Sequence, residues 1–378
     1  MKKAILLIVL VLVFLQVARI TRDAGIFRSI DEPVDLTACV PVLGPVGAED
    51  ISIDPIAKVA YIAADDRRDV FNNMDMGAYP SGAIWRLDLS QPDSQPEKID
   101  IDLIGEFHPH GIALRFSDPA SNDAGRAIEL YAVNHLSPVK HEIVVFNILE
   151  TGELKLRRRI SYPELISPND LVVVDKDQFF VSNDHGSSLN TKMAMVEDYM
   201  GVPLSSVSYF DGVEGHIVIS NLRFANGVAL SEDKQTLFVA ETTAGRVARF
   251  KRGETNLDWT LEEALDVPLG VDNFEWDGQG NLLNAGHPKL FAFQAHVKDP
   301  QALSPSQVIR INVNTKPMSF ETLYLNDGEA LSGASVAAQW QQTMLIGSVF
   351  ESHFLRCQTA QQPLETDQQD SNQQESEQ

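Results

Sequence analysis

The chain has 378 residues, of which 44% are hydrophobic and 22% are charged, so it is long enough for one large core or for two ordinary domains. Its formal net charge of −23 argues against a nucleic-acid partner, because phosphate binding needs a basic face. The same acidity fits either a solvated surface or a protein that binds cations through oxygen ligands, and total charge does not choose between the two.

The N-terminus carries a targeting segment. Lys2 and Lys3 precede an apolar run from Ala4 to Val17, which is the pattern of a signal sequence. No small-x-small cleavage site follows, so residues 1–20 are interpreted as an uncleaved signal anchor in preference to a removed signal peptide, although the run is short for a bilayer span. With residues 21–38 as a linker, we expect the remainder to be exported to the periplasm or the extracellular space, with the N-terminus contacting the membrane.

The two cysteines, Cys39 and Cys357, flank almost everything that is predicted to fold. Export permits a disulfide, and an even count in an exported chain favours a bridge over two buried free thiols. Such a bond would tie the two ends of one domain together. Residues 358–378, rich in Gln, Glu, Asp and Ser, are predicted to be a disordered acidic tail.

A polar group at the entrance to an apolar strand recurs along the chain. The six strand entrances, the last of them weaker, are Glu49-Asp50-Ile51-Ser52-Ile53, His110-Gly111-Ile112-Ala113-Leu114, Asn169-Asp170-Leu171-Val172-Val173, Asn226-Gly227-Val228-Ala229-Leu230, Asp272-Asn273-Phe274-Glu275-Trp276 and Gly333-Ala334-Ser335-Val336-Ala337. Each is followed by turn residues and further short strands, in units with a period of roughly 40–60 residues, which is the length of a propeller blade.

Six such units predict an all-β fold, a six-bladed β-propeller that forms one catalytic domain over residues 39–357. The alternative is a β-sandwich, but that fold does not explain why every unit begins with the same motif of a polar residue followed by an apolar strand. Helical periodicity is scarce, and the best candidate, Leu189 to Tyr199, is interpreted as an insertion.

In a propeller the innermost strand of every blade runs along the central channel, so equivalent strand ends meet in a ring. Carboxylates and amides that converge without a cation would repel one another and lose solvation. An oxygen-only set suits Ca²⁺, whereas zinc prefers His or Cys ligands. The ring predicted at the strand entrances consists of Glu49, Asp50, His110, Asn169, Asp170, Asn226, Asp272 and Asn273.

Three second strands end in histidine, at Asn134-His135, Asn183-Asp184-His185 and Gly286-His287-Pro288. His110 and His135 lie at corresponding ends of paired strands, so they are the preferred catalytic pair. Asp184 and His185 could equally be a buried hydrogen-bonded pair that supports the ring, and His287 is placed with them.

At these residues the chain resembles the paraoxonase/arylesterase family, whose members are six-bladed calcium propellers that hydrolyse lactones and aryl esters. The resemblance covers nearly all of residues 39–357. It is carried by the phrases Gly47-Ala48-Glu49-Asp50, Pro109-His110-Gly111-Ile112, Val133-Asn134-His135, Asn169-Asp170, Ser182-Asn183-Asp184-His185, Phe224-Ala225-Asn226-Gly227, Val271-Asp272-Asn273 and Gly347-Ser348-Val349-Phe350.

The resemblance implies two Ca²⁺ ions per chain, a closing disulfide between Cys39 and Cys357, and a retained N-terminal hydrophobic segment. His110 and His135 match the base and its partner. Asp50 and Asp170, with the Ile112 carbonyl, would hold a structural calcium. The catalytic calcium would be held by Glu49, Asn169, Asn226, Asp272 and Asn273.

The function expected from the resemblance is calcium-dependent hydrolysis of lactones and aryl esters. The alternatives are a non-enzymatic calcium-stabilised propeller that binds a ligand, and a gluconolactonase-like sugar lactonase. Residues 65–79 and 187–204 depart from the animal members of the family, so substrate preference is not carried over.

Overall fold

The computed structural model describes residues 2–30, 33–34, 36–68, 81–101, 105–118, 120–121, 125–187 and 191–359. The predicted acidic tail from residue 360 onwards and most of the divergent loop at 69–79 lie outside these ranges.

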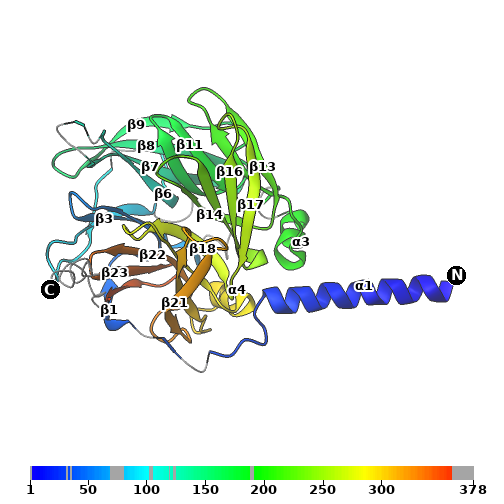
Figure 1. Cartoon of the computed structure of the whole chain (residues 1–378). Coiled ribbons are helices and arrows are strands. Elements are labelled where there is room, and N and C mark those ends of the chain that lie inside the picture. Colours follow the sequence, from blue (N-terminus) through cyan, green and yellow to red (C-terminus); the bar gives the residue numbers. More distant parts are fainter. Residues whose placement is uncertain are drawn as a thin grey trace, which may run out of the picture.

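Six four-stranded antiparallel sheets surround a common axis (Figure 1), as the repeat predicted. The first three are β2(Ala48–Asp54), β3(Val59–Ala64), β4(Ala83–Asp88), β5(Glu97–Lys98); β6(Pro109–Phe116), β7(Ala127–Ser137), β8(Lys140–Ile148), β9(Leu154–Ile160); and β10(Pro168–Asp175), β11(Gln178–Asn183), β12(Ser205–Phe210), β13(Gly215–Leu222).

The other three sheets complete the ring. They are β14(Ala225–Leu230), β15(Thr236–Glu241), β16(Arg246–Arg252), β17(Trp259–Asp266); β18(Gly270–Trp276), β19(Leu282–His287), β20(Ser306–Asn312), β21(Ser319–Asn326); and β22(Ala334–Trp340), β23(Thr343–Ser348), β24(His353–Gln358), β1(Thr37–Leu43). The six-bladed β-propeller predicted from the sequence is therefore confirmed.

The core lies between blades. Each of the six hydrophobic clusters joins two adjacent sheets: Ile84 of the first blade packs in one cluster with Leu130 of the second, and Ile51 of the first packs in another with Phe354 of the sixth. Because a sheet must bury its apolar face against another element, this arrangement gives every blade two partners and leaves the ring closed.

The innermost strands also touch one another through alternating acids and glycines. Asp50 accepts a hydrogen bond from the Ile112 amide of the next blade at 2.6 Å, and Asp170 accepts one from the Val228 amide at 2.8 Å. A Cβ on Gly111 would lie 2.6 Å from the Asn169 carbonyl, so glycine is required for the close approach of these backbones.

The ring closes within the sixth blade. The N-terminal strand β1 pairs with β24, so the chain enters as the outer strand of the last blade before it builds the first. The predicted disulfide between Cys39 and Cys357 is confirmed, and it links these two strands across 318 positions of sequence. The bond therefore reinforces strand pairing inside one sheet.

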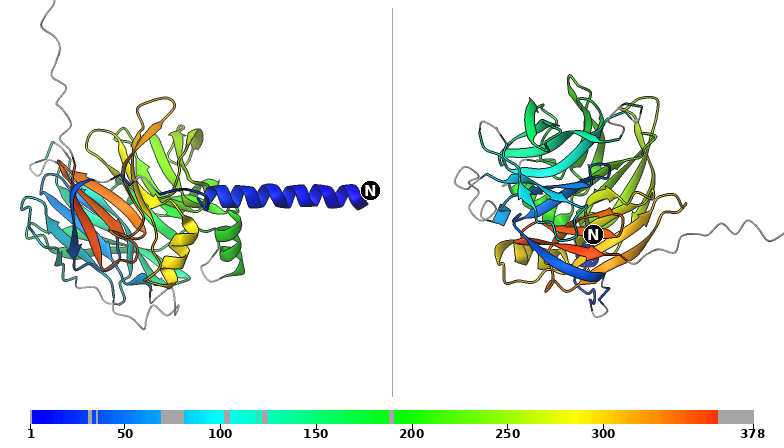
Figure 2. Two further views of the ribbon diagram at one scale, coloured as in Figure 1. Left: turned by 90° about the horizontal axis from the view of Figure 1, so that it is seen from below. Right: turned by 90° about the vertical axis from the view of Figure 1, so that its left-hand side faces the viewer.

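Helices lie on one side of the propeller. α3(Lys192–Met200) and α4(Leu290–Lys298) flank the base of α1(Lys2–Asp23), which projects away from the blades (Figure 2). Thr191 caps α3, and Gly201 ends it in the left-handed region, so the helix ends one residue after the expected Tyr199; the expected start, Leu189, lies outside the described residues. The short 3₁₀ segment η2(Thr242–Ala244) follows β15.

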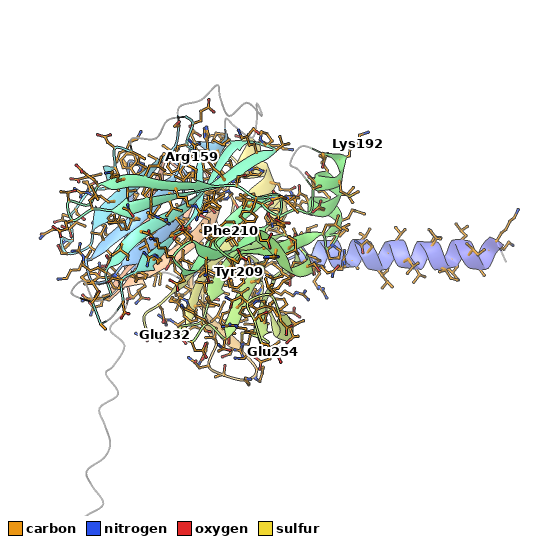
Figure 3. All side chains as sticks on the ribbon, turned by 90° about the horizontal axis from the view of Figure 1, so that it is seen from above. Arg159, Lys192, Tyr209, Phe210, Glu232 and Glu254 are labelled. Carbon is orange, nitrogen blue, oxygen red and sulfur yellow. A yellow bond between two sulfur atoms is a disulfide. The ribbon has the colours of Figure 1, made fainter. Side chains whose placement is uncertain are left out.

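The helix α1 has no buried residue, and along the part that lies away from the blades its side chains project into space on all sides (Figure 3). Among the described residues it is the one helix whose length and composition would allow it to cross a membrane, with a mean hydropathy of 2.6. It continues through Asp23, and polar residues of its last turns bond to the propeller.

Replacing both cysteines by serine should lower the free energy of unfolding by as much as about 5 kcal/mol, since the bond restricts a very long loop of the unfolded chain. The β1–β24 pairing remains in the variant, so the native circular dichroism spectrum should be retained. Chemical denaturation of wild-type and doubly substituted protein measures the difference. An unchanged denaturation midpoint would contradict the role given to the bond.

Candidate functional site

The strand entrances converge at one mouth of the central channel, as the repeat predicted. Glu49, Asn169, Asn226 and Asp272 come from four different blades and line a single cavity of about 330 Å³. Asn273 lies beside them and donates a hydrogen bond from Nδ2 to Glu49 Oε1 at 2.7 Å. All five side chains are at most 4% exposed, so their oxygen atoms have left bulk water.

These side chains carry buried oxygen atoms that lack hydrogen-bond donors. The buried atoms Glu49 Oε2, Asn169 Oδ1, Asn226 Oδ1 and Asn273 Oδ1 have no hydrogen-bond partner among the described residues. The amide nitrogen of Asn169 faces Asp184 at 3.4 Å and that of Asn273 faces Glu49, which leaves the two amide oxygens free. Buried oxygens without donors are costly, and their convergence fits a hard cation.

The residues Glu49, Asn169, Asn226, Asp272 and Asn273 form the floor of the cavity. Its two acids, Glu49 and Asp272, differ in their pKa shifts. Burial alone would raise the pKa of Glu49, but His110 and Arg67 hold it below its usual value, so this carboxylate is ionised. Burial raises the pKa of Asp272, although the His287 ring, 3.0 Å from its carboxylate, opposes the shift. His287 in turn stacks on Phe293, with ring centroids 3.6 Å apart.

Deeper in the channel lie Asp50 and Asp170, the acids assigned to a structural ion. Burial raises the pKa of Asp50 well above its usual value, and the charges of Asp170 and Glu49 add to the effect. Ile112 is buried beside them and its amide bonds to Asp50. A buried acid whose pKa is raised further by neighbouring acids again fits a bound cation.

Glu275 belongs to the same group of charges and was missed in the sequence. Burial raises its pKa to about 8, and its charge acts on both Asp50 and Asp170. It follows Asn273 by two residues in β18, so strand periodicity places both side chains on one face. That spacing was a usable signal.

His110 and His135 meet at the edge of the floor. Nδ1 of His110 lies 2.8 Å from Nε2 of His135, and Nε2 of His110 lies 3.5 Å from Glu49 Oε1. Burial, followed by the neighbouring His110, lowers the pKa of His135 well below its usual value, so this ring is neutral at pH 7. The structure thus brings the predicted pair into contact inside the cavity.

Three further residues beside the pair were not singled out in the sequence. His141 contacts His135, with 2.9 Å between their Nδ1 atoms. Arg67 donates to the Gly47 and Pro109 carbonyls, and Asp65 bonds His108 at 3.1 Å. Asp65 and Arg67 are not part of the repeated sequence motif, and His141 contacts His135 only because of the register of the hairpin. None of the three was therefore predictable from the repeat.

Asp184 and His185 form a buried ion pair with a third member. His185 bonds Asp184 at 2.7 Å and Asp198 of α3 at 2.8 Å. Burial alone would lower the pKa of His185, but the two carboxylates raise it to about 11. His185 is therefore a cation at neutral pH that ties α3 to the edge of the floor.

The outer wall of the cavity is built from helices. Ile20 of α1, Met200 of α3, and Leu290 and Phe293 of α4 line it together with Phe350. The last turns of α1 are fixed by polar contacts. Asp23 pairs with Arg223 at 2.9 Å, and Arg19 donates to the Met200 carbonyl at 2.7 Å. The cavity thus combines a floor of oxygen atoms with largely apolar walls.

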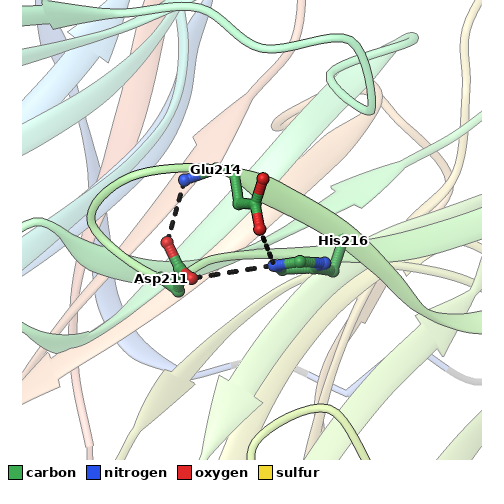
Figure 4. A group of neighbouring side chains, drawn as sticks. All are labelled: Asp211, Glu214 and His216. Carbon is green, nitrogen blue, oxygen red and sulfur yellow. Dashed lines mark hydrogen bonds and ion pairs between the residues drawn. The ribbon is translucent and has the colours of Figure 1, made fainter.

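Another group of ionisable side chains lies outside this cavity, in the turn between β12 and β13 (Figure 4). Nε2 of His216 is 3.7 Å from carboxylate oxygens of both Asp211 and Glu214. Asp211 also accepts hydrogen bonds from the Val213 and Glu214 amides, which explains its position by the geometry of the turn. Both acids are exposed.

Comparison with known proteins finds a matching protein family and similar relatives. A family model described as Arylesterase matches residues 74–358. The chain is 29% identical to serum paraoxonase/lactonase 3 of Oryctolagus cuniculus over 327 residues, which covers 84% of this chain and 88% of the relative. It is also 29% identical to human serum paraoxonase/arylesterase 1 over 334 residues, with the same coverage.

Solved structures share the fold at lower sequence identity. A luciferin-regenerating enzyme aligns with a TM-score of 0.52 and 13% identity, covering 87% of this chain and 96% of that one. The PQQ-bound aldose sugar dehydrogenase of Streptomyces coelicolor aligns with a TM-score of 0.51 and 13% identity, covering 86% and 97%. Their different chemistries show that the fold alone does not assign an activity.

The raised pKa of His185 predicts a pH-dependent contribution to stability. A cation favoured by folding contributes fully below its unfolded pKa of about 6.5, and the contribution is lost as pH rises towards about 11. The stability difference between wild type and His185→Gln should therefore shrink by up to about 1.4 kcal/mol per pH unit from pH 7 to pH 9.

Denaturant unfolding at fixed calcium concentration measures this difference. His353→Gln is the matched control, since His353 lies on β24 outside the cavity. A difference that stays constant with pH would show that His185 is not held as a cation.

Proposed function

The chain belongs to the arylesterase family, and on this basis we propose that it is a calcium-dependent hydrolase of lactones and aryl esters. The observation that carries the proposal is the position of the His110–His135 pair, which borders a ring of buried oxygen atoms without donors. An oxygen-rich floor next to a candidate base, beneath an apolar cavity, is an arrangement that could hydrolyse an apolar ester with a bound metal.

Two calcium ions are assigned to the channel. The catalytic ion would be held by Glu49, Asn169, Asn226, Asp272 and Asn273, and the structural ion by Asp50, Asp170 and the Ile112 carbonyl. When bound at the floor, calcium supplies Lewis acidity that polarises an ester carbonyl and stabilises negative charge on its oxygen.

The chain's own residues supply the base and the binding surface. His110 would take a proton from water at Nε2, because its other ring nitrogen, Nδ1, contacts His135. Neutral His135 orients it through the 2.8 Å contact at Nδ1. The apolar walls hold the acyl or aryl part of the substrate and exclude water, and Asp184, His185 and His287 support the ligands through Asn169 and Asp272.

The walls also bear on the alternatives. A sugar lactone carries several hydroxyl groups, and the cavity wall formed by Ile20, Leu290, Phe293 and Phe350 offers them few partners. A purely binding propeller would need the oxygen ring but not a histidine pair at its edge. Both observations favour an esterase or lactonase that acts on apolar substrates.

We also propose that the protein is exported and anchored by α1 with the cavity facing the membrane. The helix projects from the cavity side of the propeller (Figure 2), and beside it α3 exposes Met193, Met195, Val196, Tyr199 and Met200. Such apolar surface is stabilised by a bilayer interface. Retention of the protein in membranes washed with alkaline carbonate tests the anchor, and release into the wash would contradict it.

Removal of calcium should abolish hydrolysis and lower the melting temperature, because an ion bound only by the native state stabilises it by mass action. A panel of γ- and δ-lactones, acyl-homoserine lactones, a sugar lactone and phenyl acetate, assayed with and without a chelator, measures the first effect. Re-addition of calcium is the control. Full activity in protein shown to be metal-free by elemental analysis would refute the proposal.

Substitutions of the base and of the calcium ligands should impair different properties of the protein. His110→Gln should keep both calcium ions but lose kcat by about 10²–10⁴, which is the usual contribution of a general base. Asp272→Ala should lose one ion together with activity, since it deletes an anionic ligand. Asp170→Ala should chiefly lose stability, because its ion lies deeper in the channel.

Calcium stoichiometry measured beside kcat separates these variants, and His353→Gln serves as the control for a substituted histidine outside the cavity. Near-normal kcat in His110→Gln would show that another residue is the base.

A further inference from the structure

Arg67 is a buried cation that bridges two blades at the mouth of the channel. It follows the end of β3, its side chain is 7% exposed, and it lines the cavity together with Glu49 and His110. Its Nη1 atom donates to the Gly47 carbonyl at 3.0 Å, and its Nη2 atom donates to the Pro109 carbonyl. One guanidinium therefore spans the starts of β2 in the first blade and β6 in the second.

We propose that Arg67 is a positioning residue with two effects: it fixes the separation of Glu49 and His110, and its charge weakens the binding of calcium at the floor. The inference rests on the proposed function, in which Glu49 is a calcium ligand and His110 is the base. It adds a residue that acts through these two side chains.

The separation of the ligand and the base depends on their backbones. Nε2 of His110 lies 3.5 Å from Glu49 Oε1, which is longer than a normal hydrogen bond, so the two side chains do not hold each other firmly. Gly47 lies two residues before Glu49, and Pro109 lies directly before His110. A planar guanidinium holds its donors in a fixed geometry, so binding both carbonyls with one group restricts the relative movement of the two strand starts.

The backbone that carries Arg67 is itself held against the first blade. The Arg67 amide donates to the Asp65 carbonyl at 2.9 Å, and the Asp65 amide donates to the Gly47 carbonyl at 3.3 Å. Gly47 has a φ of +61°, and a Cβ on it would lie 2.2 Å from the Asp65 carbonyl, so glycine is required for this approach. The side chain of Arg67 thus has a fixed base from which it reaches the second blade.

The charge of Arg67 lies beside a ligand without a hydrogen bond to it. Nη2 is 3.9 Å from Glu49 Oε2, and the Glu49 side chain is 2% exposed. Oε2 has no hydrogen-bond partner among the described residues, so it is available to a cation. A guanidinium is not deprotonated in proteins, and like charges in a poorly solvated site repel each other strongly. We therefore expect Arg67 to lower the affinity of the floor for calcium.

The test replaces Arg67 by methionine, which keeps a long side chain but removes the charge and the donors. For the ion that Asp272→Ala loses, the calcium dissociation constant should fall about tenfold, because a like charge is gone. On the best lactone kcat should fall by about 10–10², because the base is displaced from the ligand, and KM should change little, because the apolar walls are kept. Competition with a chelator measures the affinity, and initial rates measure turnover.

The opposite signs of the two effects distinguish this role from a structural one, which would weaken calcium binding and slow turnover together. Arg67→Lys keeps the charge and can still donate to a carbonyl, so its calcium affinity should stay near that of wild type and its kcat should recover in part. Arg67→Gln is a second neutral variant and should also bind calcium more tightly. Arg86→Met, in β4 of the same blade and outside the cavity, is the matched control.

The two readouts separate the two proposals. A wild-type protein that binds calcium but hydrolyses no ester would refute the proposed function, while the calcium affinities of the variants would still decide the inference. Calcium binding that is unchanged or weaker in the two neutral variants, or a kcat that Arg67→Met leaves unchanged, overturns the inference.

Discussion

Six inner strands approach one axis closely enough to bring their first residues together, and the rest of the structure depends on this approach. Glycine at positions 111 and 227 permits it sterically, since a Cβ at either would lie within 2.6 Å of a backbone atom of the next blade. Asp50 and Asp170 secure it by accepting amides across the blade boundary. The same contacts bury the acids of the inner strands, so the geometry that closes the ring also creates a site that favours positive charge.

The parts of this structure that repeat were predictable from the sequence. Strand periodicity and turn residues are local signals, and six copies of one polar-to-apolar phrase specified the blades and the residues of the floor. The parts that occur once were not predictable in this way. Arg67 reaches the floor from a segment without a repeated phrase, and His141 meets His135 only because the hairpin register pairs them. Neither contact has a signature in spacing or composition.

The position of α1 in the cavity wall could not be predicted from the sequence either, for a different reason. The apolar run at the N-terminus indicated a targeting helix, but its place beside the site is set by contacts between residues far apart in the chain. Asp23 pairs with Arg223, and Arg19 bonds the carbonyl of Met200. Long-range ion pairs depend on tertiary structure, so no reading of α1 alone could assign its last turns to the wall of a pocket.

The balance of charge at the site links the fold to its chemistry. Glu49, Asp50, Asp170 and Asp272 meet within one channel, while Arg67 lies 3.9 Å from Glu49 and the cation His185 is already shared by two other acids. These few cations leave the channel acidic, and the amide oxygens of Asn169, Asn226 and Asn273 beside the acids have no hydrogen-bond donor among the described residues. A bound metal answers both needs with one group. In the proposed function the histidines at the rim then take the proton-transfer role, so that oxygen ligands and imidazoles have separate tasks.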